Sequence, residues 1–424
     1  SVIFLALTPL VAAATRSQPV FSIAARDALY RGALALTLQV ANHQLTPISH
    51  AHKDDNESNV LLSPLALALS TALVLEGSVS KTIDRLLETL RWELLKDADV
   101  RYVLAHALLR LSRLPISDAR VEAAAFVQRD FDVTGPYRES LDAYYGADVV
   151  LVNFLDRRAT LTAVNAWCCR ATAKVITSLL QEDAYKLDVT ARFLAAAVVT
   201  LNLTHFEGLF PDSRVQRAFY AVQQRGQSVD TMVGTGSFGY LELRERGFKV
   251  LELPTLSTNL SLLLALPHEG TPLKKVREAF AKEPDLLLGL HAQLKQTLVR
   301  VSLPVFKASD FPTQPPSVCG LKSSLMSMGH SYMFDRFQSN MGTVSKHGHV
   351  FMSDMLNGVA VAVSPSARPG TTSRPPTPKP GGAVSFQADR PFLYFVLDRA
   401  DQLPLALGQF GSPSGSGELR SPQC

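Results

Sequence analysis

The sequence predicts a single domain of the α+β class. Through about residue 180, apolar residues recur mainly at helical spacing. From residue 191 onwards they form near-continuous or alternating runs, which are typical of strands. A chain of 424 residues would often hold two or three domains, but no linker-like change of composition occurs before about residue 364. We therefore expect one domain over residues 25–410, with a helical N-terminal part packed against extensive β-sheets.

The helices are expected in the first part of the chain. Ser63 followed by Pro64 is a start signal, because serine caps a helix and proline fits its first turn. This predicts a helix over residues 65–75. Further helical patterns cover residues 25–44, 81–92, 101–114 and 159–180. Between them, residues 120–127 have the character of a strand.

Strands are expected from residue 191 to the C-terminal end of the domain. Residues 193–203 are almost all apolar, which suits a strand buried on both faces. Residues 250–254 and 260–267 resemble a strand pair joined by a turn. Strand patterns also cover residues 296–304, 359–363, 386–396 and 403–408. The Gly-, Ser- and Pro-rich tail, residues 411–424, is expected to be disordered.

Composition limits the partners and the compartment. A net charge of +4, with no run of five Lys or Arg residues, gives no support for nucleic-acid binding. Residues 1–14 are apolar and end in small residues, as the core and cleavage site of a secretory signal do; a buried helix is the alternative. No other stretch reaches the roughly 18 apolar residues of a transmembrane helix. We expect a secreted, extracellular monomer.

The cysteines and the N-glycosylation sequons predict which covalent modifications a secreted chain would carry. Four cysteines are too few for a disulfide framework, and the adjacent Cys168 and Cys169 would rarely bridge each other. We expect Cys168, Cys169, Cys319 and Cys424 to be buried or free thiols. Sequons begin at Asn56, in a polar insertion, and at Asn259, in a turn, so both are predicted glycan sites. A third sequon, at Asn202, lies in an apolar run and should be buried and unmodified.

No motif supports an enzyme. Residues 234–239 satisfy GxGxxG, but a strand-like segment follows where a dinucleotide site needs a helix. Neither the G-x-S-x-G nor the H-E-x-x-H motif occurs. The histidine pairs at 50 and 52 and at 347 and 349 are too closely spaced for the usual zinc frameworks. We expect no catalytic residues, no cofactor and no metal.

A set of short motifs, in order along the chain, resembles the serpin family. Residues 386–396 match the C-terminal signature of that family, and a long loop precedes them. The other matching stretches are Asn59-Val60-Leu61-Leu62-Ser63-Pro64, Val164-Asn165-Ala166-Trp167, Asn202-Leu203-Thr204-His205-Phe206-Glu207-Gly208, Leu251-Glu252-Leu253-Pro254 and Met333-Phe334-Asp335. The stretches 210–213 and 333–338 are similar to the plasminogen-activator-inhibitor and nexin branch.

The resemblance implies a large central mixed sheet, further sheets and an exposed reactive-centre loop over residues 364–388. A serine protease cuts such a loop, whose N-terminal part then inserts into the sheet as a new central strand and traps the enzyme. Aligned on the strand before the loop, the family's acidic, glycine and threonine hinge positions fall on Pro365, Ala367 and Arg368. The scissile region falls on residues 379–382, and within it on Lys379, Pro380 and Gly381. Of these, Lys379 is the residue that a trypsin-like protease would prefer before the cut bond.

The loop departs from what insertion requires. Six prolines lie within residues 364–382, and each removes a backbone N–H that a central strand would use. Arg368 and Arg374 would have to enter the core beneath the sheet, where an unpaired charge is costly. The sequence therefore predicts weak, substrate-like or lost inhibition. The alternative is a non-inhibitory serpin that acts as a carrier, chaperone or binding protein.

Two further sites follow from the resemblance or the charge pattern. Ser63 and Asn202 match a buried polar pair in the region where the family's main sheet opens, and Asn357 stands where many members have a histidine. Arg101, Arg110 and Arg113 lie on one helical segment. Three arginines usually form a solvated face, so a glycosaminoglycan partner is left open.

Overall fold

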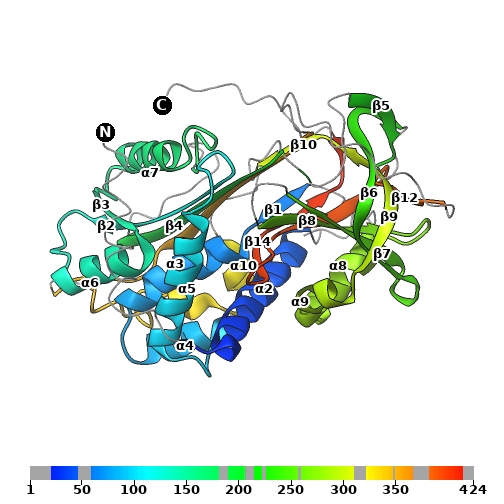
Figure 1. The fold of residues 1–424 in the computed structure, drawn as a ribbon. Helices are drawn as coiled ribbons and strands as arrows, with labels where there is room; N and C mark the ends of the chain where they lie inside the picture. Colours follow the sequence, from blue (N-terminus) through cyan, green and yellow to red (C-terminus); the bar gives the residue numbers. More distant parts are fainter. Residues whose placement is uncertain are drawn as a thin grey trace.

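The computed structural model describes residues 21–45, 59–180, 190–204, 206, 214–221, 226–255, 259–309, 321–346, 349–365 and 382–413. Helices dominate its first part and strands its second (Figure 1). The α-helices are α2 (Ile23–Leu45), α3 (Pro64–Gly77), α4 (Lys81–Thr89), α5 (Asp97–Leu111), α6 (Gly135–Ser140), α7 (Arg157–Ala171), α8 (Leu273–Lys282), α9 (Pro284–Gln293) and α10 (Lys322–Ser327). Short π or 3₁₀ turns are η1 (Leu141–Tyr145), η2 (Arg244–Arg246) and η3 (Ser331–Phe334).

A five-stranded mixed sheet has the order β10-β11-β4-β2-β3. Its central strand, β4, is parallel to the neighbouring β11, although about 150 residues separate them in the chain. The strands of this sheet are β10 (Phe306–Ser309), β11 (Asp354–Val363), β4 (Phe193–Leu203), β2 (Ala119–Gln128) and β3 (Asp148–Val152).

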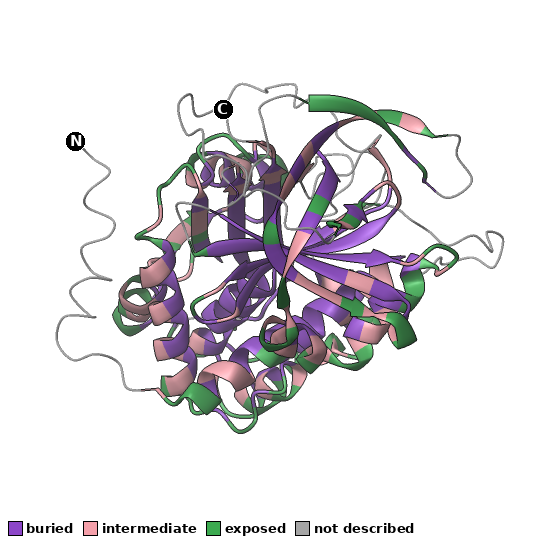
Figure 2. Ribbon diagram, turned by 45° about the vertical axis from the view of Figure 1, so that its right-hand side comes forward, coloured by how far each residue is buried: buried purple, intermediate pink, exposed green. Residues whose placement is uncertain are grey.

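A nine-stranded sheet forms the other end of the molecule, in the order β1-β14-β13-β8-β7-β6-β9-β12, with β5 paired to β6. Its strands are β1 (Val60–Leu62), β5 (Arg214–Phe219), β6 (Gln227–Leu243), β7 (Phe248–Pro254), β8 (Leu260–Pro267), β9 (Lys295–Pro304), β12 (Val384–Gln387), β13 (Phe392–Asp398) and β14 (Leu403–Phe410). Figure 2 shows the central strands of both sheets as buried and the β5 end of the β5–β6 hairpin as exposed.

The five-stranded sheet is covered on both faces by helices. α3 is buried almost along its whole length and packs beneath β4, β2 and β11. α7 lies across the opposite face (Figure 1). The apolar cluster under α7 draws residues from α7, from the segment after it, and from β2, β4 and β11. This double cover explains why β4 is apolar on both faces, as the sequence predicts.

Most strongly patterned elements are confirmed. β4 spans the predicted residues 193–203, and α3 begins at the predicted cap, where the Ser63 hydroxyl accepts a hydrogen bond from Ala66 N at 3.0 Å. β7 and β8 form the predicted antiparallel pair. The strand-like segment expected after the GxGxxG stretch is confirmed, because both lie inside β6, which pairs with β9.

The predicted helix over residues 159–180 is wrong in its second half. α7 ends at Ala171, and the chain then turns back through Ala173 and Lys174, whose φ angles are 49° and 68°. Residues 172–180 instead run beneath the helix and pack on the sheet, and we call them the return segment. Their apolar side chains produce the pattern that suggested a longer helix. The cysteine pair therefore lies in the last turn of α7.

The assignment of all of residues 364–388 to a loop is also too broad. Residues 384–387 form strand β12, which pairs in parallel with β9. None of the helices in the described part of the chain is long and apolar enough to cross a membrane.

Candidate functional site: the seam between β4 and β11

The site of interest is the boundary between β4 and β11, which we call the seam. The two strands are directly paired in parallel over ten residues, from Asp354 opposite Leu194 to Val363 opposite Leu203. In the family that the sequence resembles, a new strand would enter here. Separating the strands would break every ladder hydrogen bond of the seam before new ones could form.

The seam ends where the loop begins. Ser364 N donates to Leu203 O at 3.2 Å, one step beyond the last strand pair. Pro365 follows, and its lack of an N–H ends the donor pattern on this strand. The structure therefore places Pro365 at the exit from the seam. The other predicted hinge residues, Ala367 and Arg368, and the scissile region Lys379, Pro380 and Gly381 lie outside the described residues.

The return segment covers the middle of the seam. A Cβ added at Gly358, on β11, would lie 2.9 Å from Leu179 Cδ1 and 3.4 Å from Ile176 Cδ1. It would also lie 3.1 Å from Val198 Cγ1, and Val198 is the residue paired with Gly358 on β4. Gly358 thus gives Leu179 and Ile176 room to rest across both strands. A strand entering the seam would have to displace them.

Asn165 of α7 fastens the return segment to the helix. Its Oδ1 accepts hydrogen bonds from Leu179 N and Leu180 N, both at 2.8 Å. Its Nδ2 donates to Leu180 O, also at 2.8 Å. One side chain therefore satisfies three backbone groups of a segment that has no regular secondary structure. We call α7 and the return segment together the cover.

The cover is also attached to the edge of the sheet. Trp167 Nε1 donates to Asp148 Oδ2 at 3.1 Å. The Trp167 and Phe126 rings pack edge to face, with their centres 5.7 Å apart. One turn further along α7, at its C-terminal end, Arg120 Nη1 donates to Ala171 O at 3.0 Å. Both contacts are made to β2 or β3, on the side of β4 away from β11. The cover is therefore held from one side of the seam.

Beneath the seam, a polar contact joins β11 to α3. The Ser70 hydroxyl and the Asn357 side-chain amide lie 2.8 Å apart, and both residues are buried. With the amide nitrogen facing Ser70 and Leu356 O, the Asn357 oxygen accepts from Leu67 N, so both ends of the amide are satisfied. Ser63, at the start of α3, donates to Leu405 O of β14 at 2.5 Å.

Of the three residues predicted for the sheet-opening region, Ser63, Asn202 and Asn357, the register places Asn202 and Asn357 at different points along the seam. Asn357 pairs with Ala197, whereas Asn202 pairs with Ala362. Five residues along a strand span about 16 Å, so Asn202 cannot contact Asn357. Asn202 is half-buried near the loop end of the seam, not buried as predicted. Sequence reasoning missed Ser70, although it lies seven residues after Ser63 and so on the same face of α3.

The cysteines behave differently from each other. Cys168 keeps its thiol, which faces Ile176 O at 3.7 Å beneath the helix. Cys169 is buried and disulfide-bonded, so the expectation of a thiol is wrong for this residue. Neighbouring positions on a helix point about 100° apart, which separates the two sulfur atoms. Cys319 and Cys424 lie outside the described residues.

The arginines of α5 do not form the expected solvated face. Arg101 binds Glu76 with two hydrogen bonds, at 2.6 and 2.9 Å. Arg110 forms ion pairs with Asp398 at 3.0 Å and Asp401 at 2.8 Å. Two of the three arginines therefore point toward the body of the protein and are neutralised there. Arg113, just beyond α5, is exposed.

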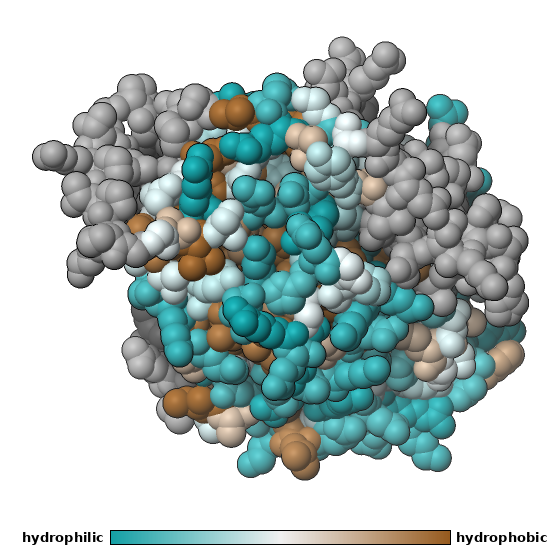
Figure 3. Space-filling view, turned by 90° about the vertical axis from the view of Figure 1, so that its right-hand side faces the viewer, coloured by the Kyte–Doolittle hydropathy of each residue, from teal (hydrophilic) through white to brown (hydrophobic). Residues whose placement is uncertain are grey.

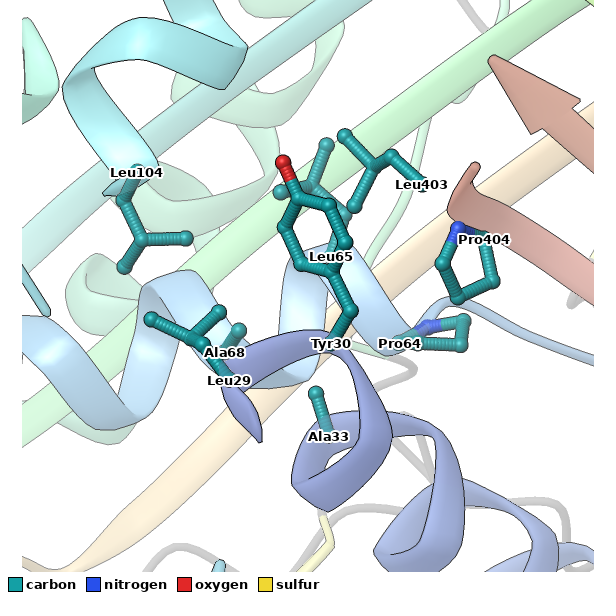
Figure 4. Close-up of a pocket in the computed structure, with 9 residues that line it drawn as sticks. All are labelled: Leu29, Tyr30, Ala33, Pro64, Leu65, Ala68, Leu104, Leu403 and Pro404. Atoms are coloured by element: carbon teal, nitrogen blue, oxygen red, sulfur yellow. The ribbon is translucent and has the colours of Figure 1, made fainter. Parts of the chain in front are cut away.

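A narrow apolar gap lies between α2, α3, α5 and the start of β14 (Figure 4). It is too narrow to hold a water molecule. The Tyr30 hydroxyl points between Leu104 and Leu403 and has no hydrogen-bond partner among the described residues. Burial raises the pKa of Tyr30 well above its usual range.

The substitution Tyr30→Phe is expected to leave the protein as stable or to stabilise it by about 1 kcal/mol, because it removes a buried hydroxyl without a partner. Urea unfolding of the wild type and the variant measures the difference. Tyr137→Phe is the matched control, since the Tyr137 hydroxyl is also buried but donates to Leu73 O at 3.0 Å. A loss of stability at Tyr30 equal to that at Tyr137 would contradict the prediction.

Only some of the predicted glycan sites and paired histidines lie within the described residues. Asn259 is exposed in the turn between β7 and β8, where a glycan would have room. Asn56 and both histidines of the 50–52 pair lie outside the described residues, as does His347. Among the residues that are described, no three His, Cys, Asp or Glu side chains come together as metal ligands would.

Comparisons with known proteins agree on one family. The family model described as "Serpin (serine protease inhibitor)" matches residues 44–413. Antithrombin-III of Homo sapiens is 23% identical over 400 residues, which cover 89% of this chain and 82% of the relative. Serpin H1 of Mus musculus is 22% identical over 369 residues, which cover 86% of this chain and 84% of the relative.

A solved structure shows the same fold. A crystal structure of native protease nexin-1 with heparin superimposes with a TM-score of 0.74 at 22% sequence identity. The match covers 91% of this chain and 99% of that one. The predicted fold class and the predicted family are both confirmed.

Proposed function

This chain belongs to the serpin family of serine protease inhibitors, and from that membership we propose that a trypsin-like serine protease cuts its loop as a substrate, with little or no trapping. The observation that carries the proposal is the ten-residue seam that leads into Pro365. Such a protein is the target of catalysis and is not itself an enzyme. It needs no cofactor for this role.

Trapping requires the loop to become a strand between β4 and β11. Each residue of a central strand exchanges backbone hydrogen bonds with its neighbours. The six prolines within residues 364–382 have no N–H to donate, and a proline in the interior of a sheet is strongly disfavoured. Proline-rich chain also favours the extended polyproline conformation, in which it remains solvated. These properties support slow or arrested insertion.

The two hinge arginines add a second barrier. β4 and β11 are buried on both faces, with α3 on one side and the cover on the other. A strand between them would carry Arg368 and Arg374 into one of these apolar layers. Burying an unpaired guanidinium costs several kcal/mol. A protease acylated on the loop would therefore be released by hydrolysis before insertion is complete.

Lys379 is the residue that would direct a trypsin-like enzyme to the loop, and the Pro380 that follows it would slow cleavage. The apolar start of the sequence supports secretion. Exposed Asn259 supports a glycoprotein, and Asn56 is proposed as a second glycan site. The ion pairs of Arg101 and Arg110 argue against a glycosaminoglycan site on α5.

Cleavage of the wild-type loop by trypsin is expected to raise the melting temperature by less than about 3 °C, because a loop that stays outside the sheet adds no ladder hydrogen bonds. Thermal melting before and after limited proteolysis measures this. A denaturing gel of the same mixture should show a nicked chain without a covalent complex. A stable complex at near-equal stoichiometry would refute the proposal.

The same hinge is compatible with a non-inhibitory serpin that binds a ligand or another protein. The gap lined by Tyr30 is too narrow for such a ligand. A carrier would show a ligand-dependent rise in melting temperature, which a plain protease substrate would not.

A further inference from the structure

The C-terminal end of the loop is attached to the body through β12. This strand is four residues long and lies at the edge of its sheet, with β9 as its neighbour. Beyond it the chain is firmly held: Ala388 N donates to Ser302 O at 2.8 Å, and Asp389 O accepts from Tyr220 N at 2.7 Å. β12 is therefore the last part of the body before the loop, and a short edge strand is easily frayed.

Lys249, near the start of β7, contacts β12 directly. Its Nζ donates to Ser385 O at 3.1 Å. The same Nζ lies 5.3 Å from the centre of the Phe386 ring. The Phe386 side chain is fully buried, so the ammonium group lies over the residue that anchors β12 in the core. Lys249 and Ser385 are joined although β6 and β9 separate their strands in the sheet order.

Both contacts are strengthened by the positive charge of Lys249. A hydrogen bond from a charged donor is about twice as strong as a neutral one. An ammonium group over an aromatic face adds a further attraction, which grows as the group loses water. Lys249 is half-buried, and burial together with the nearby Arg390 lowers its pKa from the ordinary value. The surrounding face, on the side of β7, β9 and α8, is mostly hydrophilic (Figure 3).

We propose that Lys249 is a positioning residue that clamps β12 and so fixes where the loop ends. The predicted scissile region, residues 379–382, lies within five residues of Val384. A protease holds its substrate as an extended segment on both sides of the cut bond. The point at which β12 leaves the sheet therefore determines how much chain the enzyme can grip on the C-terminal side. This proposal rests on the proposed function, because it concerns the same loop.

Chymotrypsin gives a direct test, because it cuts after aromatic residues and residues 364–385 contain none. Cleavage between Phe386 and Gln387 requires β12 to leave the sheet. In the full-length chain, Lys249→Met keeps the apolar stem but removes the donor and the charge. It is expected to raise the cleavage rate at this bond about tenfold, which corresponds to about 1.4 kcal/mol. Mass spectrometry identifies the bond, and hydrogen exchange of residues 384–387 provides a second measure.

Two variants complete the design. Lys249→Arg keeps a charged donor and should restore protection to within about twofold of the wild type. Lys295→Met removes an exposed lysine from β9 of the same sheet and should change nothing. An unchanged rate in Lys249→Met, or no rescue by arginine, would overturn the proposal. Neither result depends on whether trypsin is trapped, so a failure here is distinct from a failure of the proposed function.

Discussion

Replacement of the six prolines and of Arg368 and Arg374 between residues 364 and 382 by alanine, serine and threonine is expected to raise the melting temperature of the loop-cleaved chain by about 10 °C or more. The wild-type chain should gain little from the same cleavage. The replaced loop can donate an N–H at every position and can place a small side chain on either face of the sheet. The seam could then open once and close around a new central strand.

The measurement is thermal melting of the variant before and after trypsin cleavage at Lys379, which is retained. A matched variant that replaces only Arg368 and Arg374 separates charge from rigidity. Because the prolines remain, it should recover much less of the gain than the full replacement. If the full replacement melts at the same temperature before and after cleavage, the loop is not what prevents insertion. The barrier would then lie in the seam or in its cover.

Local signals in the sequence predicted much of the fold that surrounds the seam. The Ser63-Pro64 pair predicted the start of α3, because the cap acts on the residues next to it. The near-continuous apolar run of residues 193–203 predicted a strand buried on both faces, because a strand between two covering layers needs apolar side chains on both of its faces. The order of several motifs predicted the family, which the family model confirms.

The errors concern features that tertiary contacts decide. The turn after α7 depends on left-handed residues at Ala173 and Lys174, neither of which is a residue type that marks such a turn. Strand β12 is four residues long and gains its stability from β9 and Lys249, which are distant in the chain. Asn202 was grouped with Asn357 by motif, but the register of β4 against β11 separates them. Register cannot be read from one strand alone.

The contact between Ser70 and Asn357 shows the same limit. The two residues are 287 positions apart, and each alone is unremarkable in the sequence. They meet because α3 crosses beneath the sheet at the middle of β11. Ser70 donates its hydroxyl hydrogen to Ala66 O at 2.6 Å, as serine commonly does within a helix, and its oxygen accepts from the Asn357 amide. Its importance for the seam is therefore visible only once the helix is placed under the strand.

The substitution Asn165→Ala is expected to loosen the cover and to destabilise the protein by about 2–4 kcal/mol. The loss has a simple origin, since Leu179 N, Leu180 N and Leu180 O all lose their side-chain partner. A buried backbone group left without a partner costs about 1–3 kcal/mol. Urea unfolding measures the total. Hydrogen exchange of residues 172–180 measures the local effect and should accelerate roughly 30-fold or more.

Asn165→Asp is the matched variant for this prediction. Its carboxylate keeps both acceptor contacts to Leu179 N and Leu180 N but cannot donate to Leu180 O. Its stability should therefore lie between those of the wild type and Asn165→Ala. Faster exchange should extend to residues 356–360 of β11, because Leu179 and Ile176 rest on Gly358. If exchange increases in the return segment but not in β11, the cover is a separate layer that does not hold the seam closed.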